Sequence, residues 1–110
     1  IAVTGEGNST TTNLQQGLAK MWANVDGTGT AALDDSFNAS GLTDNGTGDF
    51  TVAINNDMSN ADYSCQFNGN SAHVGLTAIA TGSLQVFVTA ANDSSQDVDP
   101  VTYTAHGDLA

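Results

Sequence analysis

The residues with the greatest potential for chemistry in this 110-residue chain are acidic, since twelve Asp and Glu accompany one basic side chain. Residues 44–49 place Asp44 and Asp49 at the two ends of a short polar segment that offers oxygen ligands of the kind Ca²⁺ prefers. The segment lacks the spacing and the bidentate Glu of an EF-hand. Asp and Asn side chains commonly accept hydrogen bonds from nearby backbone in turns. We therefore expect residues 44–49 to form a turn, with Asp44 and Asp49 as weak Ca²⁺ candidates and no established metal site.

Other acidic residues give equally unspecific signals. Asp26, Asp34 and Asp35 could offer oxygen ligands, and so could the acidic loop at residues 93–99. The simpler interpretation is that Asp26 builds a turn and that the loop at 93–99 is a solvated run of charge. Carboxylate pairs can hydrolyse glycosides, but carboxylates scattered along the whole chain do not point to a particular pair.

The sequence contains no recognisable catalytic set. His73 and His106 fall on different expected strands, with only Asp108 close in sequence, which makes a weak case for zinc. No Ser occupies a Gly-x-Ser-x-Gly turn. We expect no enzymatic activity and no cofactor.

Aromatic side chains are the alternative route to ligand binding. Trp22, Tyr63 and Tyr103 are weak candidates for stacking on a sugar, although aromatic residues in a small β-domain usually pack in its core. Trp22 shares a face of its expected strand with Lys20, so we expect it to be partly exposed or at a subunit contact. The ligand-binding residues therefore remain open.

Composition excludes several classes of partner. The net charge is −11 and Lys20 is the only cation, so the chain cannot neutralise the phosphates of nucleic acid or dock on an anionic membrane surface. No apolar run reaches the ~20 residues of a membrane span, so we expect no membrane insertion. Cys65 is alone, which precludes an intrachain disulfide, and we expect it to pack as a small apolar residue.

The positioning elements are predicted from hydrophobic periodicity. Apolar residues alternate with polar ones in two segments, 49–55 and 83–90, which is typical of strands with one buried face. The residues expected in the core are Phe50, Val52, Ile54, Leu84, Val86 and Val88.

Weaker alternation predicts the remaining strands. They span residues 18–25, 30–37, 61–67, 73–80 and 101–106, and residues 38–43 are expected to be extended. Residues 14–25 also fit helical spacing, but Gly17 weakens a helix there. Gly75 suggests a bulge. This pattern predicts an all-β fold, a single antiparallel β-sandwich or jelly-roll-like domain of seven to eight short strands at residues 18–110. Residues 1–17 are expected to form an extended N-terminal arm or linker, with one helical turn capped by Asn13.

Several short phrases resemble a known family. They are Gly17-Leu18-Ala19-Lys20 leading to Trp22, Asp26-Gly27-Thr28-Gly29-Thr30, Ser36-Phe37-Asn38, Thr43-Asp44-Asn45-Gly46-Thr47-Gly48-Asp49-Phe50 and the closing His106-Gly107-Asp108. Together they resemble small β-domains of tailed-phage virion appendage proteins. The resemblance is strongest over residues 17–54. One departure is Asp34-Asp35, where the family tends to carry Arg.

The resemblance implies a structural virion protein: a tail fibre, head fibre or capsid decoration at the particle surface. It also implies a homotrimer that contacts other virion proteins in particle assembly or host attachment, with a host-surface glycan as an open partner. The low aromatic content and the Ala- and Val-rich core agree with stability shared between subunits. The alternative function is a secreted bacterial adhesin or a carbohydrate-binding module.

Overall fold

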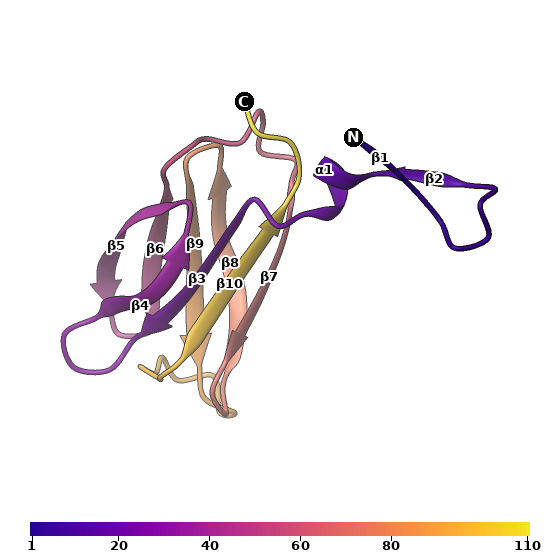
Figure 1. Ribbon diagram of the computed structural model, residues 1–110. Helices are drawn as coiled ribbons and strands as arrows, with labels where there is room; N and C mark the ends of the chain where they lie inside the picture. Colours follow the sequence, from indigo (N-terminus) through magenta and orange to yellow (C-terminus); the bar gives the residue numbers. More distant parts are fainter.

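Strand β6 (Asp49–Ile54) shows how the sequence produces the fold. Phe50, Val52 and Ile54 are buried, and the residues between them are partly exposed, as strict alternation requires. The computed structural model describes all residues, 1–110, and places β6 inside a four-stranded antiparallel sheet (Figure 1). The order in this sheet is β5 (Ala39–Gly46), β6, β9 (Ser83–Thr89) and β8 (His73–Ala80).

A second four-stranded antiparallel sheet packs against the first. Its order is β4 (Ala32–Phe37), β3 (Met21–Asp26), β10 (Val101–His106) and β7 (Ser64–Gly69). Three connections are hairpins within one sheet, namely β3–β4, β5–β6 and β8–β9, and the others cross between the sheets. The expected all-β antiparallel sandwich is therefore present, with eight strands in its two sheets.

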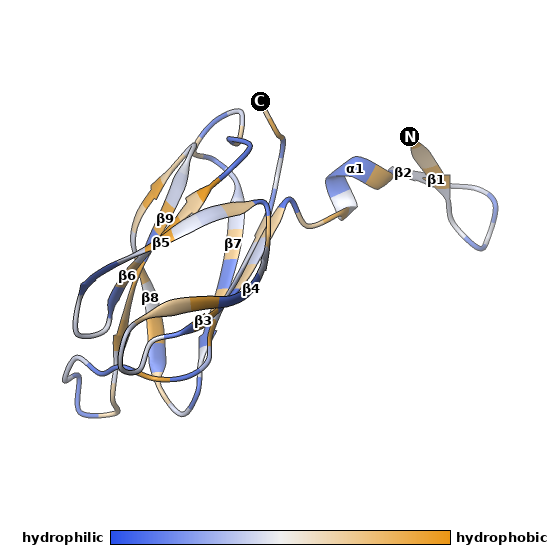
Figure 2. Cartoon of the chain, turned by 60° about the vertical axis from the view of Figure 1, so that its left-hand side comes forward, coloured by the Kyte–Doolittle hydropathy of each residue, from blue (hydrophilic) through white to orange (hydrophobic).

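The core fills the space between the two sheets. All six core residues expected from the alternation are buried there, together with Met21, Val25, Val101 and Ala105 from the opposite sheet. Figure 2 shows the hydrophobic colour concentrated along the strands, while the loops at the ends of the sandwich are mostly blue or pale. The interior contains no buried polar or charged residue, so apolar packing accounts for the association of the sheets.

The N-terminal arm stands away from the sandwich (Figure 1). It consists of strand β1 (Ala2–Thr4), strand β2 (Thr11–Asn13) and the single turn α1 (Leu14–Gly17). Asn13 caps this turn, since its Oδ1 accepts a hydrogen bond from Gln15 N at 2.9 Å. The arm expected from the sequence is present, and within it β1 and β2 pair in antiparallel register as a hairpin.

Several predicted details need correction. Residues 39–46 form an edge strand whose register shifts between Ala39 and Gly41 and again between Asp44 and Gly46, so Asn45 lies within the strand and the chain reverses only at Thr47 and Gly48. Gly75 is not at a bulge: the register of β8 shifts between Leu76 and Ala78. Gly75 instead accommodates the ring of Phe87 across the strands, since a Cβ there would lie 2.3 Å from that ring.

Candidate functional site

An open groove lies where the arm joins the sandwich. Its volume is 790 Å³, and it draws residues from four separate parts of the chain. The lining residues are Gln15, Leu18, Ala19, Lys20, Phe37, Asn38, Asn55, Asn56, Asp108 and Leu109. These segments meet because β3 and β4 are neighbours in one sheet, while the loop after β6 and the chain end after β10 reach the same end of the sandwich.

Asn38 holds the groove together. Its Nδ2 donates to the backbone oxygens of Lys20 at 2.9 Å and Asn56 at 3.1 Å, and its Oδ1 accepts from Asn56 N at 2.8 Å. The Asn38 carbonyl also accepts from Asn55 N at 2.9 Å. The residue adopts φ 58°, a left-handed conformation that Asn tolerates better than most residues. One side chain therefore fixes the crossing from β4 to β5 against two other segments.

The groove is rimmed by exposed apolar side chains. Leu18, Phe37 and Leu109 are 52%, 53% and 45% exposed. Trp22, 39% exposed, is the direct register partner of Phe37 across β3 and β4, so it extends the apolar surface onto the outer face of the sheet. Exposed apolar side chains gathered in this way are a feature of interaction surfaces in general.

The charge on the groove differs from that of the rest of the chain. Lys20, the only cation, donates through Nζ to the backbone oxygens of Gln15 and Leu18, the latter at 2.9 Å. Asp108 Oδ1 accepts from Gln16 Nε2, which ties α1 to the chain end after β10. One cation and one carboxylate are the only charged groups in the lining. The groove is thus locally balanced on a molecule of charge −11.

Two of the three aromatic candidates are structural. Tyr63 is buried, and its hydroxyl donates to Ala80 O at 2.6 Å. Burial, and secondarily Cys65, raises the pKa of Tyr63 to about 12. Tyr103 is fully enclosed, packs edge-on against Phe67, and has a pKa raised by burial and by Asp49. Neither ring can stack on a sugar, so of the three only Trp22 presents a surface to a ligand.

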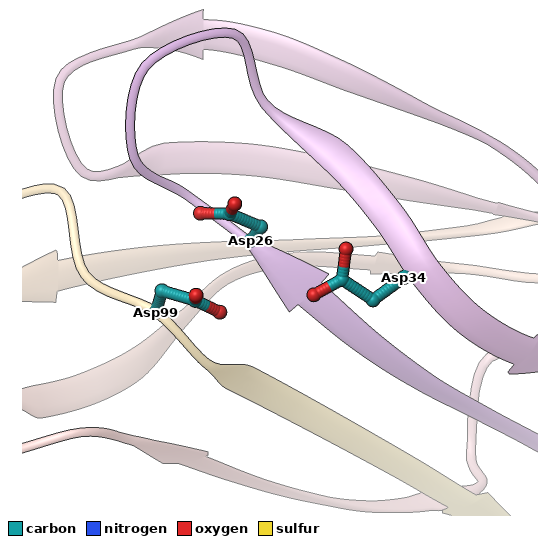
Figure 3. A group of neighbouring side chains, drawn as sticks. All are labelled: Asp26, Asp34 and Asp99. Carbon is teal, nitrogen blue, oxygen red and sulfur yellow. The ribbon is translucent and has the colours of Figure 1, made fainter.

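Three other acidic side chains gather on the surface. Asp26, Asp34 and Asp99 lie where β3, β4 and the segment before β10 meet, with ligand oxygens within 4.8 Å of one another (Figure 3). Asp26 Oδ1 already accepts from Thr28 Oγ1 at 2.6 Å and Thr28 N at 2.9 Å, and these bonds lower its pKa. Partial desolvation and the charges of Asp26 and Asp34 raise the pKa of Asp99. The carboxylates could coordinate a cation, but hydrogen bonding in the turn accounts for the position of Asp26.

The Ca²⁺ candidates of the β5–β6 hairpin have local roles. Asp44 Oδ1 accepts from Gly46 N at 3.0 Å, as in a side-chain-stabilised turn. Asp49 Oδ1 accepts from Gln85 Nε2 at 2.8 Å on the neighbouring strand. Neither belongs to a group of three potential metal ligands. In the loop at 93–99, Asp97 Oδ1 accepts from Gly48 N at 2.8 Å, so one carboxylate of that expected charge run fastens the loop to the hairpin.

The remaining chemically notable residues stay apart. His73 lies on β8 and His106 on β10, in different sheets, and neither joins a metal-binding group. Cys65 is half-buried, and burial raises the pKa of its thiol, which disfavours the reactive thiolate. Asp34 and Asp35 are exposed on β4.

The groove residues Leu18, Phe37, Asn38 and Leu109 were not identified from the sequence as a site. A signal did exist, since Leu18, Phe37 and Asn38 belong to phrases of the family resemblance. Nothing local in the sequence indicated that these phrases meet in space.

The only helix, α1, is four residues long, and no helix has the length and apolar character needed to cross a membrane. Comparisons with protein-family models, with curated proteins and with solved structures give no match.

Proposed function

We propose that this chain is a structural protein of a tailed-phage virion, a homotrimeric appendage domain of the tail-fibre, head-fibre or capsid-decoration type. It acts by binding, in particle assembly or attachment to the host surface, and carries no catalytic activity. The observation that carries the proposal is the exposed arm joined to an exposed apolar groove, because a soluble domain retains such surfaces for association with partners.

The phrases that resemble the phage family support this proposal through their positions. Residues from three of them line the groove: Leu18 to Lys20 at the arm root, Phe37 and Asn38 after β4, and Asp108 after β10. The other two phrases contain glycines that the fold requires. A Cβ at Gly27 would lie 2.7 Å from Val98 O, and one at Gly48 would lie 2.4 Å from Val88 O. The resemblance therefore involves both the fold and the association surface.

Imaging of the phage particle at side-chain resolution tests the proposal. The expected result is three copies of the sandwich around a threefold axis on the virion surface, in contact with other virion proteins. Particles complete in all their structural proteins that lack this chain would contradict it.

A secreted adhesin or carbohydrate-binding module is the second candidate function, favoured by the outer face of the β4-β3-β10-β7 sheet. Trp22 and Phe37 lie side by side there, and neutral polar residues such as Asn24, Thr104 and Gln66 continue the same face. Aromatic rings stack on sugars, while amides and hydroxyls bond their hydroxyl groups. A glycan array probed with the full chain, with and without EDTA, tests this function. Saturable binding that Trp22→Ala abolishes would support it, and an array without signal would exclude it for the glycans displayed.

A further inference from the structure

We propose that the N-terminal arm of one copy docks in the groove of a second copy, so that subunits are joined by exchanged arms. The proposal rests on the self-association in the proposed function and specifies the surfaces that carry it. The arm is defined as residues 1–17 and the groove by the ten residues that line it.

The arm is exposed to solvent, and the sandwich of its own subunit does not bury it. All of residues 1–18 are exposed, and Ile1 reaches 80% exposure. The backbone bonds of the hairpin that lie outside its ladder, such as Gly5 N to Thr10 O and Leu14 N to Ile1 O, stay within the arm. No hydrogen bond joins residues 1–13 to the sandwich. An isolated two-stranded hairpin is at best marginally stable in water, so contact with another surface would stabilise this one.

The groove offers the arm a surface of matching character. Ile1, Val3 and Leu14 are the exposed large apolar side chains of the arm, and Leu18, Phe37 and Leu109 are those of the groove. Removing such side chains from water favours association.

Charge favours the arm over the acidic sandwich as the segment of a second copy that enters the groove. The arm has a single ionisable side chain, Glu6, whereas the other eleven acidic residues all follow Gly17. The groove contains Lys20, the only basic side chain. Two sandwiches of this charge repel each other. An arm in a groove joins two copies through the least acidic segment of one and a surface of the other in which Lys20 balances Asp108.

The arm cannot readily fill the groove of its own subunit. Its root lines that groove through Gln15, and bonds from Gln16 to Asp108 and from Lys20 to Gln15 hold α1 against the sandwich. From this root the hairpin projects outward (Figure 1). Each copy therefore has one arm to donate and one groove to fill, a head-to-tail contact that closes into a ring when the rotation permits.

Mixing two complementary variants of the full chain tests the exchange. The arm variant carries Ile1→Asp and Val3→Asp, and the groove variant carries Phe37→Asp and Leu109→Asp. All four side chains are exposed, so both variants are expected to fold, which circular dichroism checks. A matched control adds two carboxylates at exposed sites outside both surfaces, Ala61→Asp and Ala91→Asp. Sedimentation equilibrium gives the masses.

Each variant alone is expected to fall to one third of the wild-type trimer mass, while the control keeps it. An equimolar mixture is expected to form a 1:1 dimer, because one intact arm meets one intact groove. A wild-type oligomer whose mass neither variant changes would overturn the exchange and leave the proposed trimer standing. A mixture that stays monomeric, with Kd weaker than about 1 mM, would also overturn it. A monomeric wild-type chain would refute both the proposed trimer and the arm exchange. Loss of glycan binding by the groove variant would then indicate that the groove binds a sugar.

Discussion

Replacing Asn38 tests whether this residue fixes the groove. The side chain makes three hydrogen bonds, to Lys20 O, Asn56 O and Asn56 N, while the backbone adopts φ 58°. Each bond stabilises the fold by about 0.5–1.5 kcal/mol. Two of the three are solvent-exposed, so water replaces them in part, and we expect Asn38→Gly to cost about 2 kcal/mol.

The comparison with Asn38→Ala isolates the backbone contribution. Ala loses the same three bonds but also carries a Cβ into the left-handed region, at a cost of roughly 1–2 kcal/mol. The greater chain entropy of Gly offsets about 0.5–1 kcal/mol of that difference. Asn38→Ala is therefore expected to cost about 3 kcal/mol, more than Asn38→Gly despite retaining more of the side chain.

Urea denaturation measures both variants against the wild type. With a slope of about 1–3 kcal/mol per M, a loss of 2 kcal/mol moves the midpoint by roughly 1 M. Ser40→Ala serves as a control, since its single side-chain bond, to Ala53 O, is 3.5 Å long and exposed. A midpoint for Asn38→Ala within the range of this control, or above that of Asn38→Gly, would refute the assigned role.

The other predictions concern the core, the sheet contact and the acidic surface. Ile54→Ala should cost about 2–5 kcal/mol, because Ile54 is buried between the sheets, and a loss under about 0.5 kcal/mol in urea titration would contradict its burial. Tyr63→Phe should cost about 1 kcal/mol through the lost bond to Ala80 O, and an unchanged midpoint would show that this bond does not contribute. The pKa of Asp99 is raised in the folded state. The contribution of this group to folding stability is therefore complete below the ordinary Asp pKa and is lost as the pH rises through the folded-state pKa. Asp99→Asn should therefore raise Tm at pH 7, by less in high salt, and a lower Tm would show that the carboxylate stabilises the fold. NaCl should raise the Tm of the wild type by screening its net charge of −11. Ca²⁺ at equal ionic strength should give no further rise. An extra rise in Tm would indicate a cation site, with Asp26, Asp34 and Asp99 as its first candidates.

The sandwich was predictable because its signals are local. Alternation at 49–55 and 83–90 identifies the two central strands of one sheet, and the six core residues follow from period two alone. Asn13 is recognisable as a helix cap because Asn is a preferred residue at that position. The structure shows the capping bond, from Gln15 N to Asn13 Oδ1.

The groove was not predictable because its parts meet only after folding. Phe37, Asn55 and Leu109 lie in three segments that no sequence period connects, and they meet where two sheets and the chain end converge. The burial of Tyr63 has a similar cause. It precedes β7 and is enclosed by Gly107, where a Cβ would lie 2.6 Å from the Cβ of Tyr63. Tyr63 was a candidate for ligand binding because it is aromatic. Packing against residues distant in the sequence buries its ring and gives it a structural role.

The mass of the wild-type chain in solution shows whether three copies associate. Light scattering at micromolar concentration, at moderate salt, measures it without any label. The expected result is a particle of three times the 11.1 kDa chain mass. A stable, folded monomer of 11.1 kDa under these conditions would contradict it.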